Sequence, residues 1–135
     1  MSEIEWFLPI FTVSEANSRE HWHKKAVRHD MQRRWVKVKF LQEKPTITLP
    51  CQITLTRIGK RKLDSDNLPI SMKWIRDAIA DNIFPGLPPG RADDDERLVW
   101  KYDQKITKIR ELGVIISFKS IKNWFYFCSS SFLDS

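Results

Sequence analysis

Between residues 46 and 82 the apolar residues change their spacing from every second position to every third or fourth. Apolar and polar residues alternate in TITLPCQITLTRI, residues 46–58, and many of them are β-branched, which predicts a half-buried strand. From about residue 67 to residue 82 the spacing is helical, and one stripe is formed by Leu68, Met72, Ile75 and Ile79. A strand followed by an amphipathic helix favours a fold that packs helices against a sheet.

The N-terminal part adds a strand and a helix to this pair. Residues 4–13 are expected to form a first strand, which Pro9 restricts to the edge of a sheet. Asn17 or Ser18 is expected to cap a basic helix over about residues 19–40.

The C-terminal part supplies two more strands. Residues 84–96 form a loop rich in Pro, Gly and Asp, and strands are expected near residues 97–106 and 111–119. The predicted order is therefore β-α-β-α-β-β, an α+β fold with a mixed or mostly antiparallel sheet and two main helices. We expect a single domain over residues 1–119 and a C-terminal tail over residues 120–135, where aromatic residues precede a serine run.

Positive charge is concentrated in the first helix. Nine Lys and Arg residues stand against three acids between Arg19 and Lys44, a surplus equal to the net charge of +6 of the whole chain. Such a segment is typical of phosphate binding, although a solvated helix face explains it equally well. The expected DNA-binding residues are Arg19, Lys24, Lys25, Arg28, Arg33, Arg34, Lys60, Arg61 and Lys62. We expect Trp22 and Trp35 to pack in the core, with stacking on unpaired bases as the alternative.

Two runs of aspartates carry the candidate chemistry. Asp64 and Asp66 are two residues apart, and in an extended segment such side chains point the same way, so their carboxylates are expected to converge. Carboxylates held together repel each other unless a cation lies between them, and Mg²⁺ takes oxygen ligands while keeping several waters. If the loop after the second helix returns Asp95 to this pair, three carboxylates meet at a metal that can activate water against a phosphodiester.

A lysine follows the first of these runs. Lys73 lies seven residues after Asp66, about two helical turns, and therefore on almost the same helix face. Its ammonium can neutralise charge at a scissile phosphate, and Asp77 can orient it through an i,i+4 pair. Purely structural roles remain open for the same residues: an N-cap for Asp66, a turn for Asp64, and a solvated surface for Lys73 and the second aspartate run.

Three passages together resemble the RusA family of Holliday junction resolvases, in particular its phage-borne members. They are NSREHWHKKAVRHDMQRRW, LDSDNLPISMKWIRDAI and ADDDERLVWKYDQKI, and the resemblance covers about residues 4–119. It implies that Asp64, Asp66 and Asp95 bind the metal, with Asp94 as the alternative to Asp95. The family's catalytic lysine corresponds to Lys73 if three extra residues are allowed after Asn67-Leu68, whereas direct counting places Ile70 there.

The resemblance also implies an activity. The family's members are Mg²⁺-dependent endonucleases that act as homodimers and nick four-way DNA junctions symmetrically in recombination and repair. The alternatives are a related nuclease acting on other branched DNA, a DNA-binding protein without catalysis, and an accessory protein that binds another protein through its aromatic tail. A cytoplasmic location without membrane association is expected, because Cys51 and Cys128 suggest free thiols and no apolar stretch approaches the length of a membrane span.

Overall fold

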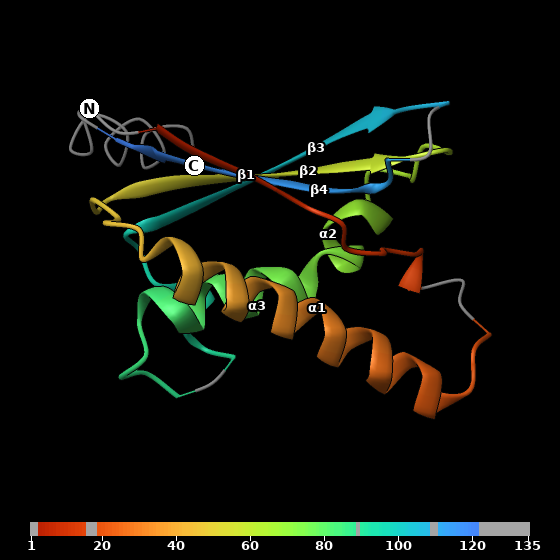
Figure 1. Ribbon diagram of the computed structural model, residues 1–135, viewed down its shortest axis with the longest axis horizontal. Coiled ribbons are helices and arrows are strands. Elements are labelled where there is room, and N and C mark those ends of the chain that lie inside the picture. Colours follow the sequence, from red (N-terminus) through yellow and green to blue (C-terminus); the bar gives the residue numbers. More distant parts are fainter. Residues whose placement is uncertain (1–2, 16–18, 89, 109–110, 122–135) are drawn as a thin grey trace.

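The computed structural model describes residues 3–15, 19–88, 90–108 and 111–121, and Figure 1 shows how the elements are arranged. In chain order they are β1 (Glu3–Leu8), α1 (Trp22–Glu43), β2 (Cys51–Gly59), α2 (Asn67–Ser71), α3 (Lys73–Ile83), the 3₁₀ turn η2 (Ala92–Asp94), β3 (Leu98–Ile106) and β4 (Gly113–Ser120). The predicted α+β domain with a mixed sheet and two main helices is confirmed. Residues 122–135 of the predicted tail lie outside the described residues.

The sheet has the strand order β1-β4-β2-β3. β4 is antiparallel to both β1 and β2, whereas β2 and β3 are parallel, with Cys51 opposite Leu98 and Gly59 opposite Ile106. β1 and β3 are therefore the edge strands. Because parallel strands begin at the same end, α2 and α3 must carry the chain from the end of β2 back to the level of its beginning.

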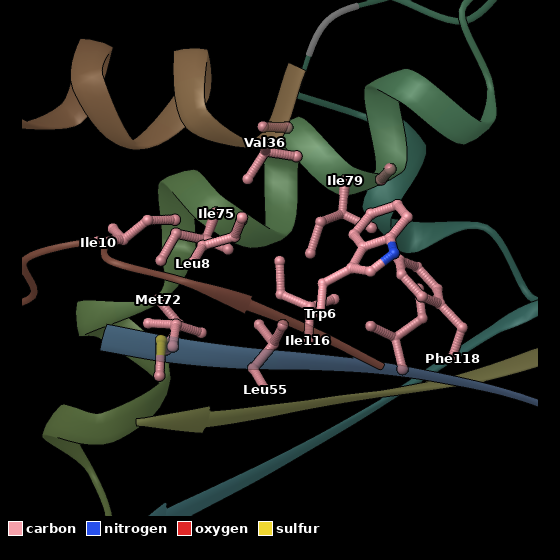
Figure 2. Packing of buried hydrophobic residues seen from close by; sticks show 14 of the residues in the cluster. Trp6, Leu8, Ile10, Val36, Leu55, Met72, Ile75, Ile79, Ile116 and Phe118 are labelled. Atoms are coloured by element: carbon pink, nitrogen blue, oxygen red, sulfur yellow. The ribbon is translucent and has the colours of Figure 1, made fainter. Parts of the chain in front are cut away.

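The helices cover one face of the sheet, and the core lies between the two layers (Figures 1 and 2). Alternate residues of the strands face the helices, among them Ile53 and Leu55 of β2, which are fully buried. Trp6 of β1 is packed edge-on against Phe40 of α1 and Phe118 of β4, with 5.0 Å between ring centroids in each pair. The predicted apolar stripe is confirmed as the inner face of α2 and α3, because its members Leu68, Met72, Ile75 and Ile79 are all buried.

The boundaries of the first two elements differ from the prediction. β1 ends at Leu8, not near residue 13, because Pro9 has no amide hydrogen and Ile10 N donates back to the Leu8 carbonyl at 2.8 Å. α1 begins at Trp22 and ends at Glu43, and its N-cap is His21, whose ring accepts from His23 N at 3.2 Å. The prediction of a cap at residues 17–18 is therefore wrong.

The predicted helix over residues 67–82 is broken at Met72. The Ser71 hydroxyl donates to the Leu68 carbonyl at 2.7 Å, and Met72 N bonds the Pro69 carbonyl three residues back, which tightens the end of α2. Met72 has φ −103° and ψ 2°, outside helical values, and α3 starts at Lys73. The hydrophobic stripe continues across the break, but the angular relation between residues before and after it changes.

The inner face of α1 is largely polar. Its buried residues are Arg28, Gln32 and Val36, and Gln32 Nε2 donates to the Phe11 carbonyl at 2.8 Å. The prediction that Trp22 and Trp35 pack in the core is wrong, since their side chains are 71% and 39% exposed. Hydrogen bonds and ion pairs thus hold the N-terminal part of α1 to segment 9–15, and apolar side chains are left on its outer surface.

Candidate nucleic-acid interface

Asp64 and Asp66 lie on the turn that opens α2, and both are exposed. The Asp64 carbonyl accepts from Asn67 N and Leu68 N, each at 3.0 Å, so a helical turn already begins at Asp64. Asp66 has helical φ and ψ values and makes no side-chain capping bond. In a helical turn residues two apart point about 200° away from each other, so the expectation that an extended segment makes these two carboxylates converge is corrected.

Asp95 lies at the other end of β3. Its carbonyl accepts from Leu98 N at 3.1 Å, where β3 begins, whereas the main chain of Leu63 bonds the Gln104 side chain at 3.0 and 2.8 Å. Leu98 and Gln104 are separated by about 20 Å of extended strand. The expected meeting of Asp95 with Asp64 is therefore not found, and residues 3–15, 19–88, 90–108 and 111–121 contain no group of three His, Cys, Asp or Glu side chains that could hold a metal ion.

Each alternative member of the second aspartate run has its own surroundings. Both carboxylate oxygens of Asp95 accept from Arg97, at 2.9 Å each, and these bonds hold the pKa of Asp95 below its usual value. Asp94 is exposed and lies 4.0 Å from an Arg76 nitrogen. The sequence offered no basis for choosing between them, and in the structure neither approaches the turn that opens α2.

Lys73 is exposed at the first position of α3, with its ammonium 5.6 Å from the Trp74 ring centroid. The break at Met72 removes the regular helical relation on which its alignment with Asp66 was predicted. Its expected pair with Asp77 is not among the salt bridges of the described residues, although the Lys73 charge is one of the factors that lower the pKa of Asp77.

Arg76, which the sequence did not single out, connects α3 to η2 and β3. Its guanidinium donates to Asp93 Oδ2 and to the Tyr102 hydroxyl, both at 2.9 Å, and lies 4.8 Å from the Trp100 ring centroid. Trp100 in turn donates its indole hydrogen to the Asp93 carbonyl at 2.9 Å. Burial, followed by the charge of Asp93, raises the pKa of Asp77 to about 6. Asp93 therefore holds Arg76 by a hydrogen bond, and its charge also repels the carboxylate of Asp77.

A large hollow of about 910 Å³ opens beside Asp64. It lies along β3, which is an edge strand with no neighbouring strand on one side, and Trp100 and Tyr102 of this strand are only half-buried. Asp64 and Ser65 line it from the turn before α2, and Lys101 and Asp103 line it from β3. Carboxylate, ammonium and aromatic groups therefore surround one space.

Exposed cations lie at the same end of the molecule as the turn that opens α2. The start of α1, the connection after β2 and the end of β3 lie at the same end of the molecule (Figure 1). The predicted DNA-binding residues at this end that are exposed are Arg19, Lys24, Lys60, Arg61 and Lys62, whereas Lys25 is half-buried. Cations without tight carboxylate partners at one end of a protein suit a phosphate backbone.

Three predicted DNA-binding residues have other surroundings. Arg28 is 8% exposed and forms ion pairs with Glu15 and Glu20, so its assignment to DNA is corrected to a structural role. Arg34 pairs with Asp30 at 2.9 Å on the surface of α1, and Arg33 is exposed there. A buried cation such as Arg28 satisfies its neighbouring carboxylates and is not free to meet a phosphate, whereas Arg33 and Arg34 remain on the surface.

The fold and this surface define a class: a two-layer α+β protein with a basic end built around a carboxylate-lined hollow. Comparisons with protein-family models, curated proteins and solved structures found no match. Within the part of the chain that the structure describes, no helix is long and apolar enough to cross a membrane.

Proposed function

We propose that this protein is a Mg²⁺-dependent, structure-selective endonuclease that cuts branched DNA, with the four-way junction as its substrate. The observation that carries the proposal is the position of Asp64, in a hollow shared with Lys62 and Lys101 at the basic end of the molecule. A carboxylate among cations suits a phosphodiester because the cations hold a backbone that the carboxylate alone would repel. The resemblance of the two aspartate motifs to the RusA family points to the same substrate.

The donor set fits a hydrated Mg²⁺ ion better than the predicted three-carboxylate site. Asp64 and Asp103 line one hollow, and Asp66 follows on the same turn, whereas Asp95 lies at the far end of β3. Mg²⁺ keeps several waters and needs only one or two carboxylates. When bound, the ion would supply an activated water and stabilise charge on the phosphodiester. Asp64 would hold it, with Asp103, which lines the same hollow, as a second oxygen donor.

The rest of the chain would position the substrate. Exposed cations at the start of α1 and after β2 would bind successive phosphates, and Trp100 and Tyr102 are among the residues that line the hollow. A two-fold junction is matched by a two-fold enzyme, so the proposal includes a homodimer that acts in the cytoplasm.

A second candidate is a protein that binds branched DNA without cutting it. One observation favours it: no three-carboxylate group forms within the described ranges. In that case Asp64 and Asp66 only open α2, and the basic end alone carries the function.

The two candidates are separated by cleavage of a labelled four-way junction, beside linear duplex, with Mg²⁺ or with EDTA. We expect paired nicks on the junction that require Mg²⁺ and disappear in Asp64→Asn while DNA affinity is kept or increased. Asp30→Asn, which removes an exposed carboxylate of α1, is the matched control and should cut normally. Binding without cleavage under all divalent ions would leave the second candidate, and absence of binding at low salt would refute both.

Asp95→Asn tests the location of the site. If the hollow beside Asp64 is complete, this variant keeps its cleavage rate. Loss of cleavage in Asp95→Asn would contradict a site built only from the carboxylates of this hollow, Asp64 and Asp103.

A further inference from the structure

A second hollow, of about 250 Å³, lies between residues 10–13 and the end of β2. Arg57 is inside it, on the face of β2 that bears the helices, since Ile53 and Leu55 on the same face are core residues. Lys60 and Arg61 line the same hollow and are exposed. Three cations therefore surround one small space at the basic end.

The Arg57 guanidinium is held in a fixed position. Its Nε donates to Thr12 Oγ1 at 3.0 Å and one terminal nitrogen donates to the Arg61 carbonyl at 2.9 Å. It also lies directly over Gly59, where a Cβ would come within 2.4 Å of that terminal nitrogen. The absence of a side chain at Gly59 thus makes room for the guanidinium.

No carboxylate balances these charges. In the described residues the salt bridges of arginine and lysine involve Arg28, Arg34, Lys39, Arg76 and Arg97, but neither Arg57 nor the two cations beside it. Both acceptors of Arg57 are neutral, and burial lowers the pKa of its guanidinium with no acidic neighbour to offset the effect. A partly buried charge without a counter-ion is unfavourable, so the arrangement is suited to an anion from outside the chain.

We infer that this hollow is a binding site for a phosphate group, with Arg57 as its fixed donor and Lys60 and Arg61 at its rim. A guanidinium presents several N–H donors in a plane that matches phosphate oxygens. The Thr12 hydroxyl, which accepts from Arg57, can still donate its own hydrogen to an oxyanion. Thr12 itself is buried, with 7% of its surface exposed. The sequence patterns predicted no role for Arg57.

The phosphate would come from DNA, and in this respect the inference rests on the proposed function. Lys60 and Arg61 line this hollow, and the next two residues, Lys62 and Leu63, line the hollow beside Asp64. One short connection therefore separates the two spaces. A backbone phosphate seated at Arg57 would fix the strand whose neighbouring phosphodiester reaches Asp64.

The test compares wild type with Arg57→Gln in two assays. In the first, inorganic phosphate is titrated at constant ionic strength while arginine Nε–H resonances are followed by NMR; we expect a saturable shift of the Arg57 resonance. In the second, four-way junction binding is measured from low to high salt. Arg57→Gln should reduce the slope of log K against log salt by about 0.9, which is roughly an eightfold loss of affinity at 0.1 M salt.

Arg91→Gln is the matched control, because it removes the same charge from an exposed arginine in the 84–96 loop, at the opposite end of the molecule (Figure 1). It should change neither readout. If Arg57→Gln fails to fold, Gly59→Ala and Arg57→Lys decide instead, since the first displaces the guanidinium and the second keeps the charge without the planar donors. Both should weaken phosphate and DNA binding.

The outcomes separate the inference from the proposed function. Saturable phosphate binding at Arg57 in a protein that binds no DNA would uphold the phosphate site and refute its DNA source together with the proposed function. Junction cleavage with an unchanged salt slope in Arg57→Gln, and no saturable phosphate shift in wild type, would overturn the inference and leave the nuclease proposal standing.

Discussion

Replacing Asp77 with Asn is expected to stabilise the folded protein above pH 6 and to abolish the part of the pH dependence of stability that the Asp77 carboxyl causes. Asp77 lies on α3, partly buried, where burial and then the Asp93 charge raise its pKa from the ordinary 3.8 to about 6, although Lys73 and Arg76 oppose the change. The folded state thus favours the protonated carboxyl. Asparagine resembles that form and carries no charge to repel Asp93.

The sign and size of the effect follow from proton binding. The unfolded chain releases this proton near pH 4 and the folded chain near pH 6, so between these values the folded state holds more protons and the free energy of unfolding falls as pH rises. Each pKa unit is worth about 1.4 kcal/mol, so the full change corresponds to about 3 kcal/mol. Because the carboxyl is only partly buried, solvent screens it, and we expect about 1 kcal/mol above pH 6.

The assay is urea unfolding of wild type and Asp77→Asn at several values between pH 4 and pH 8, followed by tryptophan fluorescence. The difference between the two proteins should be close to zero at pH 4 and grow to its full value by pH 7. Asp30→Asn, which removes an exposed carboxylate paired with Arg34, should show no comparable growth. A difference that stays constant with pH, or a variant that is less stable at pH 7, would refute the reasoning.

Three further perturbations test the fold. Gly113→Ala is expected to destabilise by about 1–3 kcal/mol, because its Cβ would lie 2.4 Å from a carbonyl oxygen of β1. Gly86→Ala, with nothing within 4 Å, should change stability by less than about 1 kcal/mol, so equal urea midpoints for the two would contradict the structure. Arg76→Met should cost about 2 kcal/mol and speed amide exchange in η2, because Asp93 loses its partner at 2.9 Å; unchanged protection there would be the contrary result. Trp22→Ala should leave the free energy of unfolding within about 0.5 kcal/mol, since the ring is 71% exposed, and a loss of several kcal/mol would show that it packs after all.

Much of the fold could be predicted because hydrophobic spacing is a local property. The stripe from Leu68 to Ile79 was recognisable without knowledge of its partners, and all of its members are buried. The buried face of α1 was not recognisable in the same way. Arg28 and Gln32 are buried there because they bond Glu15 and Phe11, which are 13 and 21 residues away in the sequence. Polar burial depends on partners that no periodicity reveals. The prediction that Trp22 packs in the core was therefore wrong, because Arg28 and Gln32 occupy the buried face of α1.

The phosphate hollow was missed for the same reason. Arg57 and Thr12 are 45 residues apart in sequence, and Arg57 occupies a core-facing position of a strand in which an arginine has no evident purpose. Only the structure shows that segment 10–13 and the end of β2 line one hollow. The neighbouring run Lys60–Lys62 could be predicted as a basic surface because its charges are consecutive.

The separation of the aspartates has a topological cause. A helix that follows β2 returns the chain to the level where β2 began, and a parallel β3 then starts beside Cys51, which leaves Asp95 at one end of the sheet and Asp64 at the other. An antiparallel β3 would have brought them together, and residue spacing cannot distinguish the two pairings. A site that uses both carboxylates therefore has to take them from two chains. If both Asp64→Asn and Asp95→Asn abolish cleavage, an equal mixture of the two variants should regain part of the wild-type rate, since a mixed dimer would carry one intact pair.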